Sequence, residues 1–416
     1  MKKKWFNRIV LLFLVYCALM FLYIFYWSDS SIPNSLKGSV VDPTTFMEAE
    51  QLEQANFYSQ IRNFLFFIIT PLEWLFYFTI LVFGASHSLE KWSKSKRRGF
   101  RAIAFVLALS VLNFLVFLPI KFYSYRLAVQ YNISTQSVPA WFKDNLISFT
   151  INTAIAIIVA LLFFALIRRF RKNWWFYAWL VTVPLTIFMV FLQPVVIDPL
   201  YNDFYPLKDK ALEEKILALA KKADIPTRHV YEVNMSEKTT ALNAYVTGIG
   251  DNSRIVLWDT TLEQLTEEEV LFVMAHEMAH YVEKDVYQSV GIHLAVSFIG
   301  LWLASWIIHQ IVARKDNIWQ IRSMQDFSVL PLLLLIVSIL SFIYSPIDNS
   351  FSRMQERRAD RYALELTQDA EAGISSFQKL STYGLSQINP PYLVKIFRYG
   401  HPTMLERMQT LDEATD

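Results

Sequence analysis

The chain has 416 residues, of which 54% are hydrophobic, 16% aromatic and only 18% charged. Soluble domains carry about 25% charged residues, so this balance argues against an ordinary soluble protein and for a membrane protein. The formal net charge is only +2 and basic residues are not interleaved with aromatic ones, so we expect no nucleic-acid partner.

Seven stretches are apolar enough to cross a bilayer, which takes about 20 residues each. They are Ile9–Trp27, Phe64–Phe83, Ile103–Ile120, Leu146–Ile167, Trp174–Val195, Val290–Val312 and Val329–Tyr344. The first follows three lysines but is long and lacks a small-residue cleavage site, so we interpret it as a retained span rather than a signal peptide. It contains Cys17, the single cysteine, so the sequence predicts neither an intrachain disulfide nor a thiolate metal site.

Lysine and arginine gather in four segments: the N-terminus and the loops that join spans two to three, four to five and six to seven. The loops around 28–60 and 121–144 carry few basic residues. Because positively charged loops stay in the cytoplasm, we expect a multi-pass cell-membrane protein whose segments 196–289 and 345–416 lie together on the extracytoplasmic face.

Within the spans, Glu73, Asn113, His293 and His309 are polar. Glu73 is expected to face either an interior cavity or the interface, and the two histidines to bond between helices.

The segment after the fifth span mixes helix and strand. Asp209–Ala223 has helical periodicity, and Arg228–Val233 and Arg254–Trp258 are predicted to be short strands. Thr266 with Glu269 three residues later forms a capping box, which predicts the start of a further helix.

That helix carries the most informative motif of the chain, His276-Glu277-Met278-Ala279-His280. Residues four apart lie on one helical face, so both imidazoles can reach a single metal ion. Glu277 is then placed to accept a proton from the attacking water, as in zinc peptidases.

The third ligand is expected from the block Ser352–Asp360. Glu356 and Asp360 are four residues apart, so one helical face offers a carboxylate to the metal and another to a ligand histidine, which usually donates its second N–H to such a group. We expect Glu356 to be the ligand and Asp360 the partner. An ordinary charged helix is the alternative, because the arginines at 353, 357 and 358 could pair with these acids.

These residues make the chain resemble the type I CAAX prenyl endopeptidases, membrane zinc metallopeptidases that include smaller bacterial members. The likeness rests on His276, Glu277 and His280, on Asp285, on Glu356 with Ala359 and Asp360, on Asn243–Gly248, and on His401-Pro402 with Arg407. The number of spans also agrees.

The resemblance implies one Zn²⁺ bound by His276, His280 and Glu356, with Asp360 orienting a ligand. It matches Asp285 to a family position near the metal. It implies that Asn243, Ala244, Tyr245, Val246 and Thr247 form an edge strand that pairs with an extended peptide substrate. His401 or Arg407 would stabilise the developing oxyanion. Eukaryotic members carry an aromatic residue at Val246 and face the cytosol with their zinc side, unlike the orientation that the charges favour here.

We therefore expect a mainly α protein, with a seven-helix transmembrane bundle around a chamber and a small α+β zincin-like domain. Residues 1–200 would hold spans one to five, 201–289 the metallopeptidase segment, 290–345 spans six and seven, and 346–416 a helical segment with the third ligand. The expected function is hydrolysis of membrane-associated peptides or proteins by a zinc metalloendopeptidase. The alternatives are a non-catalytic zinc-stabilised receptor and a transporter, and the sequence leaves the oligomeric state open.

Overall fold

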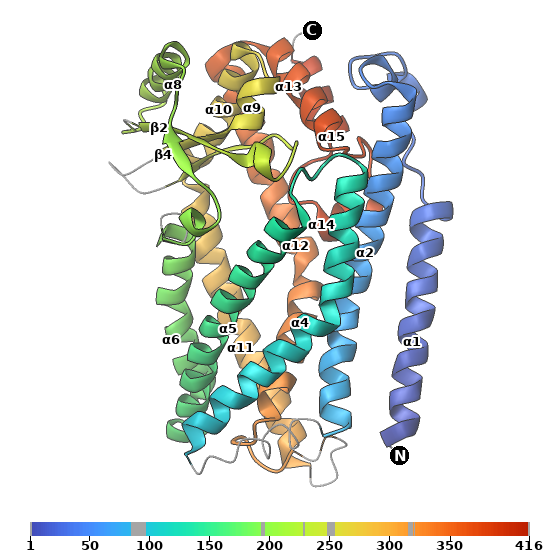
Figure 1. Ribbon diagram of the computed structural model, residues 1–416, viewed down its shortest axis with the longest axis vertical. Coiled ribbons are helices and arrows are strands. Elements are labelled where there is room, and N and C mark those ends of the chain that lie inside the picture. The colour runs from blue at the N-terminus through green and yellow to red at the C-terminus, as the bar shows by residue number, and fades with distance from the viewer. Residues whose placement is uncertain are drawn as a thin grey trace.

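The computed structural model describes residues 2–84, 97–192, 196–227, 229–247, 254–314, 319 and 321–414. Long helices run side by side along the long axis, and a small sheet with shorter helices caps one end of them (Figure 1). The expected fold class, a mainly α seven-helix bundle with a small α+β part, is confirmed.

Among the described residues, seven helical segments are long and apolar enough to cross a membrane. They are α1 (Lys2–Leu22), α2 (Ala49–Val82), α4 (Arg98–Gln130), α5 (Val138–Arg169), α6 (Trp174–Ile187), which a π-helical turn extends to Leu192, α11 (Asp285–Ala313) and α12 (Val329–Thr367). Each corresponds to a predicted span, although Val195, the expected end of the fifth span, lies outside the described residues.

Several of these helices are longer than a bilayer requires. The 39 residues of α12 correspond to about 58 Å at about 1.5 Å per residue, against a hydrocarbon thickness of about 30 Å. The helix passes through Pro346 without a break. The seventh span and the helix that carries Glu356 are therefore one element. The boundary predicted at 345/346 lies inside α12, because the apolar run ends there but the helix continues.

The sheet has four strands in the order β1-β2-β4-β3. They are β1 (Phe204–Pro206), β2 (His229–Val233), β3 (Ala244–Thr247) and β4 (Arg254–Trp258). β2 and β4 are parallel, and β1 and β3 flank them antiparallel. β2 and β4 are the two strands predicted from periodicity, except that Arg228 lies outside the described residues. Because β3 pairs only with β4 among the described strands, its other edge is free to accept a further strand.

Among the described residues, six α-helices complete the capping part: α8 (Lys210–Lys222), α9 (Asp259–Gln264), α10 (Glu267–Val282), α13 (Ala370–Tyr383), α14 (Tyr392–Arg398) and α15 (Met404–Asp412). The core of this part surrounds α10, whose Phe272, Met274 and Met278 are fully buried. Each such side chain contributes about 1.5–3 kcal/mol of transfer free energy. Gly373 allows α13 to approach, since a Cβ there would lie 2.6 Å from the Phe272 ring.

The start of α1 and the helix ends that flank the connections α2–α4, α5–α6 and α11–α12 lie at the end of the bundle opposite the sheet, at the bottom of Figure 1. The N-terminus and these connections are the basic segments of the sequence, although Lys91, Lys94, Lys96 and Lys315 lie outside the described residues. The sheet, α10 and the C-terminal helices share the other end, as a seven-span topology requires.

The bundle contains a cavity of about 660 Å³ lined by both Glu73 and Asn113. Tyr77 of the same helix and Ser338 of α12 donate hydrogen bonds to Glu73 (3.2 and 3.4 Å), so this carboxylate is held between two helices. His309 bonds to the carbonyl oxygen of Ser305 in its own helix (2.7 Å), not between helices as expected.

Candidate metal centre

Helix α10 begins as its capping box predicts. The Thr266 hydroxyl accepts a hydrogen bond from the Glu269 N–H, and the Glu269 carboxylate accepts one from the Thr266 N–H (2.7 Å). Glu269 is buried and also accepts hydrogen bonds from Ser375 and Lys379 of α13. The cap thus fixes both the start of α10 and its contact with the neighbouring helix.

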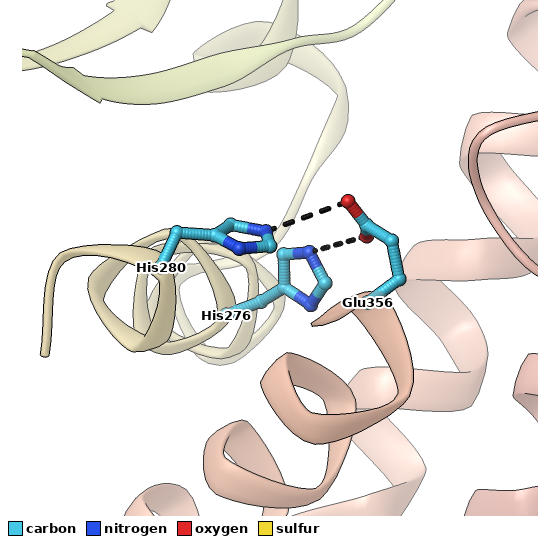
Figure 2. Close-up of side chains that lie close together, drawn as sticks. All are labelled: His276, His280 and Glu356. Carbon is cyan, nitrogen blue, oxygen red and sulfur yellow. Dashed lines mark ion pairs between the residues drawn. The ribbon is translucent and has the colours of Figure 1, made fainter. Parts of the chain in front are cut away.

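His276 and His280 project from the same face of α10 toward Glu356 of α12 (Figure 2). One ligand atom from each of the three lies within 4.8 Å of the others. Nε2 of His276 is 3.1 Å from one Glu356 oxygen, and Nε2 of His280 is 3.5 Å from the other. The structure therefore brings together the two motif histidines and a carboxylate from 76 residues further along the chain.

This donor set fits a zinc ion. Bonds of about 2.0–2.2 Å in tetrahedral geometry place ligand atoms about 3.4 Å apart, close to the separations seen here. The buried Oε2 atom of Glu356 faces Nε2 of His276 at 3.1 Å, and when that imidazole is neutral with its proton on Nδ1, this oxygen has no hydrogen-bond donor. A buried carboxylate oxygen without a donor is costly unless a cation satisfies it.

Each histidine is supported from behind by a carboxylate. Nδ1 of His276 lies 2.9 Å from Asp360, and Arg407 of α15 binds both oxygens of Asp360 at 2.9 and 2.5 Å. Asp360 and Arg407 are 2% and 6% exposed, and the guanidinium stacks 4.0 Å above the Phe377 ring. With Nδ1–H donated to Asp360, the lone pair of Nε2 is free for a metal.

The second histidine has a similar arrangement. Nδ1 of His280 lies 2.9 Å from Asp285, the first residue of α11, and Asp285 accepts a hydrogen bond from Arg358 of α12 at 2.6 Å. Arg358 also lies 3.6 Å from Glu283. Asp285 thus contacts a ligand histidine, while Arg358 was considered in the sequence only as a partner of Glu356 or Asp360.

The alternative of an ordinary charged helix does not describe α12. Arg353 donates to backbone carbonyls near α14, and Arg357 pairs with Glu406. No contact of Arg353, Arg357 or Arg358 with Glu356 or Asp360 is seen among the described residues. Glu356 faces both histidines, and Asp360 faces His276 and Arg407.

Burial sets the electrostatics around Glu277. It raises the pKa of the Glu277 carboxyl above its ordinary value, against the opposing effect of the two histidines. Burial alone would lower the pKa of His276, but hydrogen bonds with Asp360 and Glu356 outweigh it and raise that pKa to about 9. In the absence of metal, both the Glu277 carboxylate and the His276 imidazole therefore bind a proton more tightly than they would in water.

A cavity of about 940 Å³ opens at the cluster. Its wall includes Glu277, His280, Glu356, His401 and the strand residues 243–246, together with side chains of α6 and α11 such as His293. Nε2 of His401 is 3.3 Å from Glu356, and its side chain is 61% exposed. The structure therefore brings four of the five predicted strand residues and His401 to the cluster.

Thr247 lies elsewhere. It lines a separate cavity of about 220 Å³ with Asp203, Tyr231 and Arg254 on the sheet. Arg407 lies behind His276, engaged with Asp360, and lines a smaller cavity of about 270 Å³ on the far side of Glu277.

Two family models match successive parts of the chain. Residues 206–415 match the model of peptidase family M48, and residues 22–203 match the model of the CAAX prenyl protease N-terminal region with five membrane helices.

Relatives match along most of the chain. The metalloprotease YhfN of Bacillus subtilis is 48% identical over 98% of this chain and 96% of its own length. The human CAAX prenyl protease 1 homolog is 25% identical over 93% of this chain and 90% of its own. The crystal structure of Ste24p from S. mikatae superposes with a TM-score of 0.80 at 24% identity, covering 99% and 98% of the two chains, which shows the same fold.

Proposed function

The chain belongs to peptidase family M48 and is a membrane metallopeptidase, and from that premise we propose that it is a zinc endopeptidase with Glu277 as general base. The observation that carries the proposal is the cluster of His276, His280 and Glu356 within 4.8 Å. Glu277 and a free sheet edge border the same cavity.

One Zn²⁺ per chain would be held by the two histidines and Glu356. Zinc bound there supplies a Lewis acid that polarises the scissile carbonyl and lowers the pKa of water toward neutrality. Glu277 accepts the proton of the attacking water and returns it to the leaving amine. Its raised pKa suits this role, since a general base works best with a pKa near the operating pH.

Other residues of the chain orient this chemistry. Asp360 and Asp285 fix the tautomers of the two histidines through their Nδ1 atoms. His401, exposed into the cavity beside Glu356, is positioned to donate a hydrogen bond to the developing oxyanion. Arg407 acts indirectly, as a positioning residue that holds Asp360.

The substrate is an extended peptide that adds a strand to β3, with backbone hydrogen bonds giving affinity. The large cavity is walled on one side by Leu185 and Met189 of the fifth span and by Val286 and Val290 of the sixth. Apolar side chains from membrane helices favour a substrate that is itself membrane-associated.

The zinc site would face the outside of the cell, because the helix ends that border the basic loops lie at the opposite end of the bundle. This orientation separates the site from cytosolic prenylated chains, so we favour turnover of membrane proteins and peptides over prenyl-protein processing. In a Cys17→Ala background, an impermeant maleimide should label Thr410→Cys in intact cells and Lys172→Cys only after permeabilisation. The reverse pattern would invert the orientation.

The decisive experiment measures zinc stoichiometry and casein cleavage in detergent for the wild type and Glu277→Gln. We expect one zinc per chain in both and cleavage by the wild type alone. Glu268→Gln is the matched control, because it changes an exposed glutamate in the first turn of the same helix and should cleave normally.

Cleavage by Glu277→Gln at the wild-type rate would refute the general-base role. Zinc binding without cleavage of casein or membrane-protein substrates by the wild type would favour a non-catalytic receptor, and solute flux without proteolysis would favour a transporter.

A further inference from the structure

A second cavity, of about 270 Å³, lies beside the cluster on the His276 side. It shares Asn243, Ala244, Glu277 and His401 with the larger cavity. The two cavities therefore meet at the proposed general base and at the start of β3. A peptide strand lying along β3 passes from one cavity to the other, with its scissile bond between them.

The wall of this small cavity is mostly apolar. It includes Val273 of α10, Phe377 and Leu380 of α13, and Met404 of α15. Its volume equals that of roughly nine water molecules at about 30 Å³ each, which suits one large amino-acid side chain rather than a lipid chain.

The wall also holds polar residues, among them Asn243, Ser386, Gln387 and Arg407. Gln387 is only 3% exposed, yet its side-chain oxygen is buried without a hydrogen-bond partner. Its backbone is held in place, because its N–H donates to the Ser59 hydroxyl (3.1 Å), which donates to the carbonyl oxygen of Leu385 (3.0 Å). α2 thus fixes an unsatisfied amide in the wall of a cavity that also offers apolar surface from α10, α13 and α15.

A buried amide oxygen without a donor has lost its hydrogen bond to water and gained none in return. A ligand group that supplies the donor restores a hydrogen bond, and one that cannot leaves the group unpaired. The Gln387 amide therefore distinguishes side chains of similar size by the polarity of their ends.

We propose that the small cavity is the subsite for the substrate residue that flanks the scissile bond, and that Gln387 makes it prefer an apolar side chain with a hydrogen-bonding end, such as tyrosine or glutamine. The inference rests on the proposed peptidase function and adds a side-chain preference to it.

The first test digests a randomised peptide library with the zinc-loaded wild type and sequences the new ends of the products. At one of the two flanking positions, tyrosine should exceed phenylalanine and glutamine should exceed methionine by about tenfold, the effect of one net hydrogen bond. Which product end carries the preference tells the direction of the bound chain. In Gln387→Met both ratios should fall to about one, while Gln409→Met, the same change on the outer surface of α15, should keep them.

The second test does not depend on turnover. Four fluorescent peptides that differ only in tyrosine, phenylalanine, glutamine or methionine at the mapped position are titrated into zinc-loaded Glu277→Gln, with and without Gln387→Met. If the library yields no cleavage and hence no mapped position, the four residues are placed at each central position of the peptide in turn. Tighter binding of the tyrosine and glutamine peptides, lost in Gln387→Met, supports the subsite even if the hydrolytic mechanism fails. Equal affinities within each pair at every position, no binding, or a preference that survives Gln387→Met would overturn it.

Discussion

The two histidines of the metal centre are supported by similar sets of residues at different depths. The inner triad consists of His276, Asp360 and Arg407, and joins α10, α12 and α15. The outer triad consists of His280, Asp285 and Arg358, and joins α10, α11 and α12. In both, a carboxylate lies 2.9 Å from Nδ1 of the histidine and is bound by an arginine.

The arginines distinguish the triads. The side chain of Arg407 is 6% exposed, whereas that of Arg358 is 37% exposed. Water can replace an exposed guanidinium, but a buried carboxylate that loses its partner keeps an uncompensated charge. The inner triad should therefore determine whether the site forms, and the outer triad should adjust how tightly it holds the metal.

The largest effect is expected from Arg407→Met. Removing one member of a buried ion pair costs about 3–5 kcal/mol, because Asp360 stays charged in an apolar environment. The thermal unfolding temperature of the detergent-solubilised protein should fall sharply. Adding Asp360→Asn to Arg407→Met should recover much of the loss, since the buried charge is then gone. A double variant no more stable than Arg407→Met would contradict this account.

A comparison of Asp360→Asn with Asp285→Asn tests the triads at the metal itself. Loss of a carboxylate behind a ligand histidine lowers metal affinity by about 10–100-fold. We expect Asp360→Asn near the upper limit, because it also leaves Arg407 buried without its partner, and Asp285→Asn near the lower limit. Competition with a zinc chelator gives both constants. Equal losses would mean that depth does not distinguish the triads.

The pH dependence of zinc binding should belong to the inner triad. Zinc needs the neutral form of His276, whose pKa without metal is about 9. Below that pH one proton must leave, so affinity should rise about tenfold per pH unit between pH 7 and 9 and level off above. Asp360→Asn lowers the pKa of His276 and should flatten this slope, whereas Asp285→Asn should keep it. A flat wild-type profile would show that no proton is displaced from His276 in this range.

Features with local causes could be predicted from the sequence. Apolar runs indicated the seven helices, the capping box fixed the start of α10, and the spacing of His276 and His280 placed both on one face. Each depends on neighbours within a few turns. The strand β1 was missed because three residues ending in Pro206 carry almost no periodic signal.

The choice of partner could not be predicted. Asp360 pairs with an arginine 47 residues away, and Asp285 with one 73 residues away, although arginines lie within three residues of Asp360 on its own helix. Helix packing decides this choice: Arg357 and Arg358 project from other faces of α12 than the two acids and meet Glu406 and Asp285 instead. No pattern in the sequence distinguishes a carboxylate that meets a nearby arginine from one that meets a distant one.

The smallest effect is expected from Arg358→Gln. Partly exposed ion pairs contribute about 0–1 kcal/mol, and salt screens them. Asp285 keeps its contact with His280, and water can reach the place of the guanidinium, so zinc affinity should fall only two- to threefold and stability hardly at all. The loss of zinc affinity should be greatest at low ionic strength and disappear near 1 M salt. The effect of Arg407→Met should not depend on salt in this way. Arg357→Gln, next to it on the same helix and paired with Glu406, is the matched control and should leave zinc affinity unchanged. A tenfold or greater loss of zinc affinity in Arg358→Gln would mean that the outer triad is as important for metal binding as the inner one. Water would then have failed to replace the arginine.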